Sequence, residues 1–112
     1  MAIGDVMQKK LLAKALSITD TDNTITGVAN TITTITSITL VNLNTTTART
    51  VTIAGYGHAV ANTVAVIPLA ALATEMLTGL DYVLAAGEIY YFSQDIGTDV
   101  NVTVMGIEEV VA

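Results

Sequence analysis

Residues 100–105 read Val-Asn-Val-Thr-Val-Met, with a valine at every second position. Successive side chains of a β-strand point to opposite faces of its sheet, so this strict alternation predicts a strand with one apolar face. Valine and threonine also lose side-chain freedom in helices and pack well on a pleated surface. The segment therefore predicts a half-buried strand whose core face carries Val100, Val102 and Val104.

The same residue types dominate the chain from Ser17 onward, where Thr, Val and Ile are punctuated by Asn, Asp and Gly. Further strands are expected over residues 38–43, 48–53, 62–69, 82–84 and 89–93, with turns over 44–47 and 85–88. Strands recurring every 8–12 residues or so are typical of a sandwich or barrel. The predicted fold is all-β, a single antiparallel β-sandwich of the jelly-roll type. Residues 68–79 fit a helix, a loop or two short strands, and stay open.

The composition fits one small domain that associates with partners. The chain has 112 residues and is 52% hydrophobic but only 12% charged, where about 25% charged is typical. Such a composition excludes a disordered chain. A domain of this size hides only about 60–70% of the surface of its unfolded chain, so apolar surface should remain exposed for self-association. Cysteine is absent, which excludes disulfide frameworks and thiolate metal sites.

Residues 1–16 are predicted to form an arm, possibly helical, ahead of a sandwich domain over residues 17–112. Asp5 is a suitable N-cap, Gln8 follows three residues later as in a capping box, and lysines suit the C-terminal end of a helix. A helix this short is marginal alone, so we expect the arm to serve assembly rather than the fold of the sandwich. The candidate interface residues are Ile3, Val6, Met7, Lys9, Lys10 and Leu11.

Charge is spread unevenly along the chain. The net charge is −6, and the four basic residues all lie in the first half, the last being Arg49. A binder of nucleic acid needs a basic stripe, so we expect no nucleic-acid partner. The apolar stretch 64–84 is interrupted by Pro68, Glu75 and Asp81, so no membrane span is expected either. A basic arm and an acidic body could dock on each other between copies.

No group of residues reaches the level of a catalytic or metal site. The single histidine, His58, lies in a Gly-rich segment without a nucleophile or carboxylate close in sequence. Asp20 and Asp22 resemble only part of a calcium loop, and Asp95 and Asp99 flank Gly97, where a turn is favoured over a weak calcium site. Glu108 and Glu109 end the last strand and are expected to face solvent. No enzyme activity, cofactor or metal is expected.

An aromatic cluster, Tyr90-Tyr91-Phe92, supports one rival function, a sugar- or ligand-binding module. Strand geometry places Tyr90 and Phe92 on one face and Tyr91 on the other. At most part of the cluster can therefore face a ligand, and packing in the core is favoured.

Four segments resemble small β-sandwich virion proteins of tailed bacteriophages: TSITLVNLNTTTARTVTI (36–53), VIPLAALA (66–73), YVLAAGEIYYF (82–92) and VNVTVMGIEE (100–109). The shared pattern begins with a strand that ends in Asn42, followed by a Thr-rich turn (45–47) and a second strand. It continues with an Ala-Ala-Gly-acid turn (85–88) and closes with a strand that ends in Gly-hydrophobic-Glu (106–108). The resemblance implies a capsid decoration (cement) protein located in the virion, bound to the major capsid protein and homo-oligomeric as a trimer. A neck, tail or fibre-attachment protein is the alternative.

Overall fold

The computed structural model describes residues 3–16, 23–55 and 63–111. These residues form β-strands joined by turns and contain no helix: β1 (Val6–Ala15), β2 (Thr24–Thr26), β3 (Thr31–Asn42), β4 (Arg49–Gly55), β5 (Thr63–Leu69), β6 (Thr74–Leu77), β7 (Tyr82–Leu84), β8 (Ile89–Gln94) and β9 (Val100–Val110). No helix in the described ranges is thus long and apolar enough to cross a membrane.

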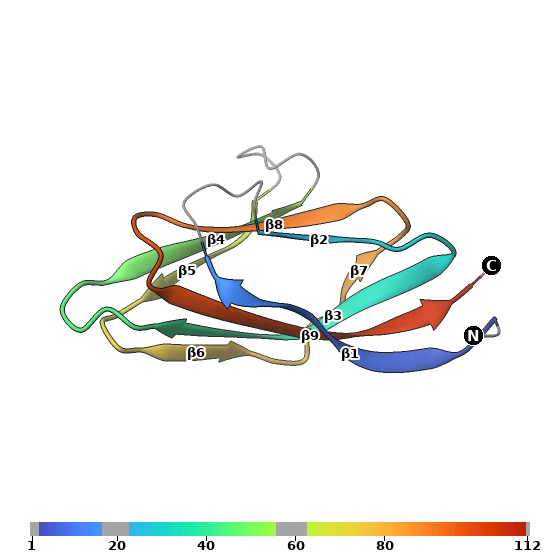
Figure 1. Ribbon diagram of the computed structural model, residues 1–112, viewed down its shortest axis with the longest axis horizontal. Coiled ribbons are helices and arrows are strands. Elements are labelled where there is room, and N and C mark those ends of the chain that lie inside the picture. Colours follow the sequence, from blue (N-terminus) through green and yellow to red (C-terminus); the bar gives the residue numbers. More distant parts are fainter. Residues whose placement is uncertain (1–2, 17–22, 56–62, 112) are drawn as a thin grey trace.

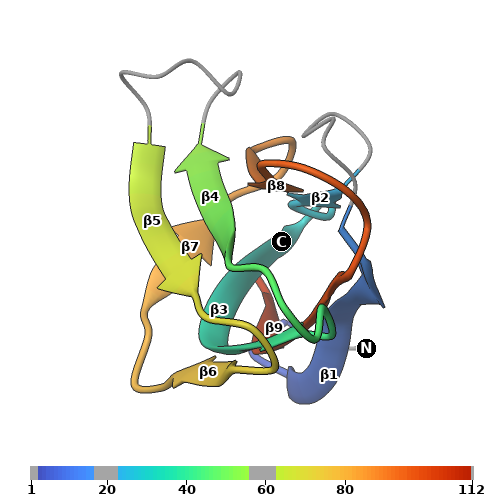
Figure 2. The ribbon, with the colours of Figure 1, turned by 90° about the vertical axis from the view of Figure 1, so that its left-hand side faces the viewer.

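The strands form two antiparallel sheets that pack face to face (Figures 1 and 2). Sheet A has the order β1-β9-β3-β6, with β7 also paired to β3, and sheet B has the order β2-β8-β4-β5. The chain alternates between the sheets from β1 to β4 and crosses back for β6, β8 and β9. This is the double-sheet jelly-roll arrangement. The prediction of an antiparallel β-sandwich is confirmed.

The core lies between the sheets, and β9 contributes a row of regularly alternating buried side chains to it. Val100, Val102 and Val104 are buried, whereas Asn101 and Met105 on the other face are exposed. The register predicted for this strand is therefore confirmed. The remaining fully buried large side chains come from both sheets and from the residue after β1: Leu16, Ile35, Ile38, Leu40, Val51, Ile53, Leu69, Leu84 and Phe92.

The helix predicted for the N-terminal arm is wrong. Residues 6–15 form β1, which pairs with β9 from Val6↔Glu109 to Ala15↔Asn101. Leu11 and Leu12 pack against the core, and the backbone N–H of Leu16 donates to the carbonyl of Val100 at 2.8 Å. Pairing with a distant strand satisfies the backbone groups of this segment better than an isolated short helix could. Residues 6–15 thus belong to sheet A.

Bulges bend sheet A near its middle. The register of β1 against β9 shifts between Lys10 and Leu12, and that of β3 against β9 shifts between Ile35 and Ser37. The β3 shift adjoins Gly106, where an added Cβ would collide with the Thr34 carbonyl oxygen and lie 2.5 Å from Cδ1 of Leu11, the extra residue of the β1 bulge. A bulge adds one residue and increases the local twist, and glycine leaves room for the resulting close approach.

The segment left open by the sequence, residues 68–79, adopts strands and a turn. Pro68 and Leu69 end β5, a turn follows in which Leu72 has φ 58°, and β6 begins at Thr74. β6 pairs with β3 from Ile38↔Leu77 to Val41↔Thr74. Two short strands were one of the expected alternatives, and the helical spacing of Leu72 and Met76 had no structural consequence.

Candidate functional site

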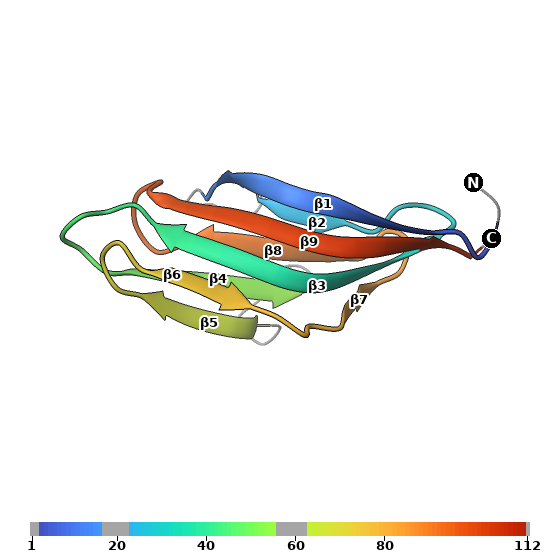
Figure 3. The ribbon, with the colours of Figure 1, turned by 90° about the horizontal axis from the view of Figure 1, so that it is seen from below.

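Five of the six predicted interface residues lie along β1, which is one edge of sheet A (Figure 3), and Ile3 lies just before it. Val6 pairs with Glu109 and Lys10 with Met105, so both side chains are on the outer face of the sheet. Lys9, which pairs with Gly106, is on the core side. Ile3, Val6, Met7 and Lys10 are exposed, while Lys9 and Leu11 are half-buried. The six residues share an edge but not a face.

Lys9 has a specific partner that the sequence did not predict. Its Nζ lies 3.3 Å from Oε1 of Glu108, a side chain only 11% exposed. The expectation that Glu108 faces solvent is therefore wrong, because β9 continues its alternation to Val110 and places this residue on the core side. Glu109 is exposed, as expected. A carboxylate this buried needs a cation to offset its lost hydration, so the Lys9–Glu108 pair fixes β1 on β9.

The outer face of sheet A presents large apolar side chains to solvent. Five of them belong to different strands of the sheet: Val6, Ile32, Met76, Val83 and Met105. Around them lie threonines, and the charged residues that the register places on this face are Lys10 and Glu109. This face, which exposes apolar side chains from five strands, is a candidate interaction surface.

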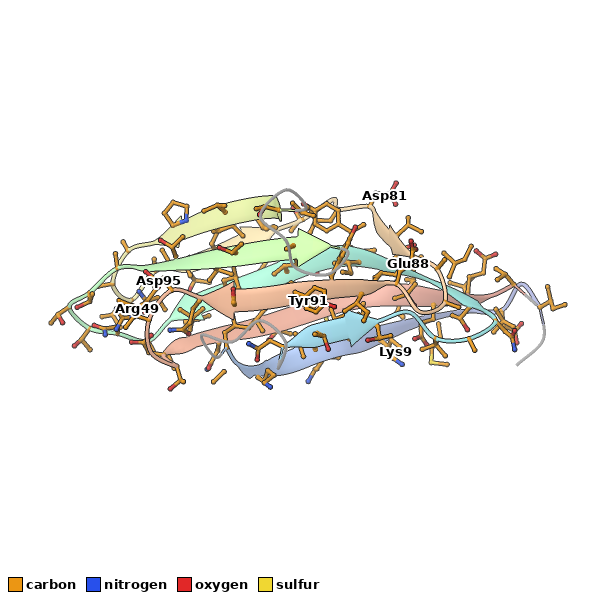
Figure 4. All side chains as sticks on the ribbon, turned by 90° about the horizontal axis from the view of Figure 1, so that it is seen from above. Lys9, Arg49, Asp81, Glu88, Tyr91 and Asp95 are labelled. Atoms are coloured by element: carbon orange, nitrogen blue, oxygen red, sulfur yellow. The ribbon has the colours of Figure 1, made fainter. Side chains whose placement is uncertain are left out.

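The opposite edge of sheet A is acidic. β6 and β7 form this edge, and they carry or adjoin the exposed Glu75 and Asp81. Figure 4 shows Asp81 and Lys9 on opposite sides of the sandwich, at a similar position along its long axis. One sheet therefore has a basic edge at β1 and an acidic edge at β6–β7.

A cluster of polar side chains joins the loops at one end of the sandwich. Asp99 accepts hydrogen bonds from Arg49 Nε at 2.9 Å, Asn44 Nδ2 at 2.9 Å and Gln94 Nε2 at 3.0 Å. The Arg49 and Asp99 side chains are 13% and 25% exposed. Asn42, which is buried, donates to the carbonyls of Thr47 and Ala70 and shapes the predicted turn at 44–47. Since these donors occupy the Asp99 carboxylate, the loop over residues 95–99 is a structural turn and not a calcium loop.

The Arg49 guanidinium, followed by Asn44 and Gln94, holds the pKa of the Asp99 carboxyl well below its usual range, and Asp99 in turn raises the pKa of Arg49. Because the Asp99 pKa is lower in the folded than in the unfolded state, its stabilisation is complete above about pH 5 and begins to decline near the unfolded value of about 3.9. It is fully lost only as the pH falls through the lower pKa of the folded state.

Asp99→Asn should therefore lower the melting temperature at neutral pH by several degrees, because an amide cannot pair with Arg49 as an anion does. The difference from the wild-type chain should shrink as the pH is lowered toward 2, because protonation of Asp99 in the unfolded state then offsets part of the stabilisation of the wild type. Thermal unfolding followed by circular dichroism across this pH range measures both effects. Asp95→Asn is the control, since Asp95 is exposed in the same loop. Equal effects of the two substitutions would contradict a special role for Asp99.

The aromatic cluster is mostly used for packing. Phe92 is fully buried and Tyr90 packs against the core, with its ring 5.7 Å from that of Tyr82 in an edge-to-face arrangement. Burial, more than the neighbouring Tyr82 and Glu88, raises the pKa of Tyr90. Tyr91 alone of the three is on the outer face of sheet B, opposite Thr24. The cluster therefore does not form the aromatic platform that a sugar-binding module would need.

Three of the candidate residues, Asp20, Asp22 and His58, lie outside the described residues. Within the described ranges, no three His, Asp or Glu side chains come together as metal ligands would. The charged groups that are brought together, Lys9 with Glu108 and Arg49 with Asp99, are ion pairs that join strands and loops.

Comparison with known proteins reveals a likeness of fold. No protein-family model matches the sequence, and no curated protein is similar to it. Among solved structures, the chain is similar to a protein of Bacillus endospore appendages, which are described as disulfide-linked pili. The TM-score is 0.50 at 12% identity, over 99% of this chain and 93% of that one. The 112 residues contain no cysteine, so they cannot form a disulfide link of that kind. What the chain shares with the appendage protein is its β-fold.

Proposed function

We propose that this chain is a non-enzymatic structural subunit of a virion, a capsid decoration protein that binds the major capsid protein and assembles with copies of itself as a trimer. The observation that carries the proposal is sheet A, which combines an apolar outer face with a basic edge and an acidic edge. A subunit that repeats on a larger particle needs exposed surfaces of this kind.

Two further observations support a structural role. The Lys9–Glu108 and Arg49–Asp99 pairs join strands and loops of the sandwich, and the described residues include no group of three side chains that could hold a metal ion. The jelly-roll architecture is also common in viral capsid proteins, an argument by analogy of fold. The resemblance of residues 36–53 and 100–109 to phage virion proteins favours a virion protein among the proteins that share this architecture.

A subunit of a fibre or tail is the second candidate. It is favoured by the likeness to the protein of the Bacillus endospore appendages, which are described as pili. Both candidates require contacts between copies, but a decoration protein binds the outside of a shell and a fibre subunit binds mainly its own kind.

Binding of the purified chain to isolated capsid shells that lack it tests the first candidate. We expect saturable binding, at a fixed number of copies per shell, and shells that withstand higher temperature once they are covered. The same protein should show no comparable binding to isolated tails. Binding to tails, or growth of fibres without any affinity for shells, would overturn the decoration role and favour the second candidate.

A further inference from the structure

We propose that the β1 edge of one copy docks on the β6–β7 edge of a second copy, so that sheet A continues from subunit to subunit. The inference rests on the proposed function, because it names the self-contact of that structural subunit. It makes Lys14 the neighbour of Glu75 in the second copy, and Lys10 the neighbour of Asp81.

The register of sheet A places the two edges at matching heights. Leu12–Ala15 of β1 pairs with residues 104–101 of β9, which pair with residues 38–41 of β3, and these pair with β6. The four residues of Thr74–Leu77 thus stand on the same rows of the sheet as the four residues of Leu12–Ala15. One such row runs from Lys14 through the buried Val102 and Leu40 to Glu75. The same row therefore ends in a cation at one edge and an anion at the other.

The irregular parts of the two edges also match. β1 is interrupted by its bulge between Lys10 and Leu12, beside Met105 and Val104. The opposite edge is interrupted between Leu77, which ends β6, and Tyr82, which begins β7. In that gap the Leu80 N–H donates to the carbonyl of Thr36, at the bulge of β3. Asp81 therefore lies close to the row of Lys10. Each edge thus consists of two segments, and the interruption between them lies at the same rows of the sheet on both edges.

The strand directions suit an antiparallel contact. In sheet A, β1 and β3 each run antiparallel to β9, and β6 runs antiparallel to β3. β6 therefore runs opposite to β1, and a second copy placed side by side brings its β1 antiparallel to β6. Edge strands present unpaired backbone N–H and C=O groups that such a neighbour can satisfy.

Apolar side chains add area to the contact. Val83 and Met76 are 51% and 60% exposed on the β6–β7 edge, and Val6 is 59% exposed on β1. In the side-by-side register Met76 lies opposite Ala13, and Val83 lies diagonal to Val6. Cross-strand pairs at these positions are close enough to interact. Burial of these side chains supplies affinity, while the charges select the register.

Lysines and bulges usually protect an edge strand from pairing. Here they act selectively, because a lysine-bearing edge repels a second β1 edge but attracts an acidic one. The contact is heterologous, since it uses two different edges of each copy. It therefore closes into a ring, such as the proposed trimer, or continues as a fibre.

Charge reversal across the two edges tests the contact. Sedimentation velocity over a range of concentrations should show self-association of the wild-type chain. Lys14→Glu and Glu75→Lys should each weaken it by about tenfold, because each replaces an attraction by a repulsion. The double variant, which again has opposite charges on the two edges, should associate within about threefold of wild type. Lys10→Glu and Asp81→Lys form a second pair for the same comparison, should Lys14→Glu impair folding.

Glu109→Lys is the matched control. It makes the same charge change on an exposed residue of sheet A, in the interior strand β9. A monomeric wild-type chain, a double variant as weak as the singles, or an equal loss from Glu109→Lys would overturn the proposed contact. The shell-binding experiment distinguishes failure of this contact from failure of the proposed function. Monomers that still bind and cover shells would refute the contact alone. Self-associated chains that do not bind shells would refute the decoration role alone.

Discussion

Val102→Asp is expected to leave most of the protein unfolded. Val102 is 1% exposed in the middle of β9, between Leu40 of β3 and Lys14 of β1. Substitution removes a buried valine, worth about 1.5–3 kcal/mol, and places a carboxylate in the core at a further cost of several kcal/mol. The total approaches the whole stability of a small domain, about 5–15 kcal/mol. Urea unfolding followed by circular dichroism measures the loss.

Thr103→Asp is the control for this prediction. Thr103 is the next residue of the same strand, but it points to the outer face and is half exposed. Its replacement should cost no more than about 1 kcal/mol, since the added charge stays in water. Equal unfolding midpoints for the two variants would mean that the register of β9 is wrong.

Deletion of residues 1–12 is expected to abolish cooperative unfolding. It removes most of the β1 ladder on β9, the contacts of Leu11 and Leu12 with the core, and the cation that pairs with Glu108. Lost apolar burial and hydrogen bonds together cost on the order of 5 kcal/mol. This expectation is the opposite of the one drawn from the sequence, where the segment served assembly and was dispensable for folding. Calorimetry of the truncated chain provides the measurement.

A shorter deletion separates the strand from the residues before it. Removal of residues 1–5 leaves β1 intact from Val6 onward, although it also removes the hydrogen bonds of Gly4 and Asp5 with Val110. This variant should fold with a modestly lower melting temperature. A cooperative transition in the chain lacking residues 1–12 would contradict the structural role of β1.

The sequence predicts those strands in which local pattern and tertiary environment agree. In residues 100–104 of β9 and 51–53 of β4 every second residue is apolar and faces the core, so the period of two is visible. The turns at 44–47 and 85–88 were predicted from residue types that favour turns, and Gly87 indeed has φ 81°. In these segments the local sequence alone determines which face is buried.

The N-terminal strand could not be predicted in this way. Its bulge directs two consecutive residues, Leu11 and Leu12, toward the core and interrupts the alternation. Asp5 and the lysines satisfy the rules for helix ends equally well. The deciding interaction is with β9, nearly the whole chain length away, and such non-local pairing leaves no local signal.

The surface features were predictable only in part. The excess of apolar residues indicated an interaction surface, and the basic N-terminal segment indicated one side of it. The acidic edge was not predicted. Glu75 and Asp81 come to one side of the sheet only through the pairing of β6 and β7 with β3, and this pairing is not visible in the local sequence. The Arg49–Asp99 pair had one available signal: Arg49 is the single base in residues 17–112.

We infer that this chain repeats on a particle through contacts between its copies. Electron cryomicroscopy of the native assembly that contains the chain tests it most directly. We predict many copies on the outer surface of the shell, with β1 of each copy against β6 and β7 of the next. Isolated copies with no contact between them, or a particle surface without the chain, would contradict the account.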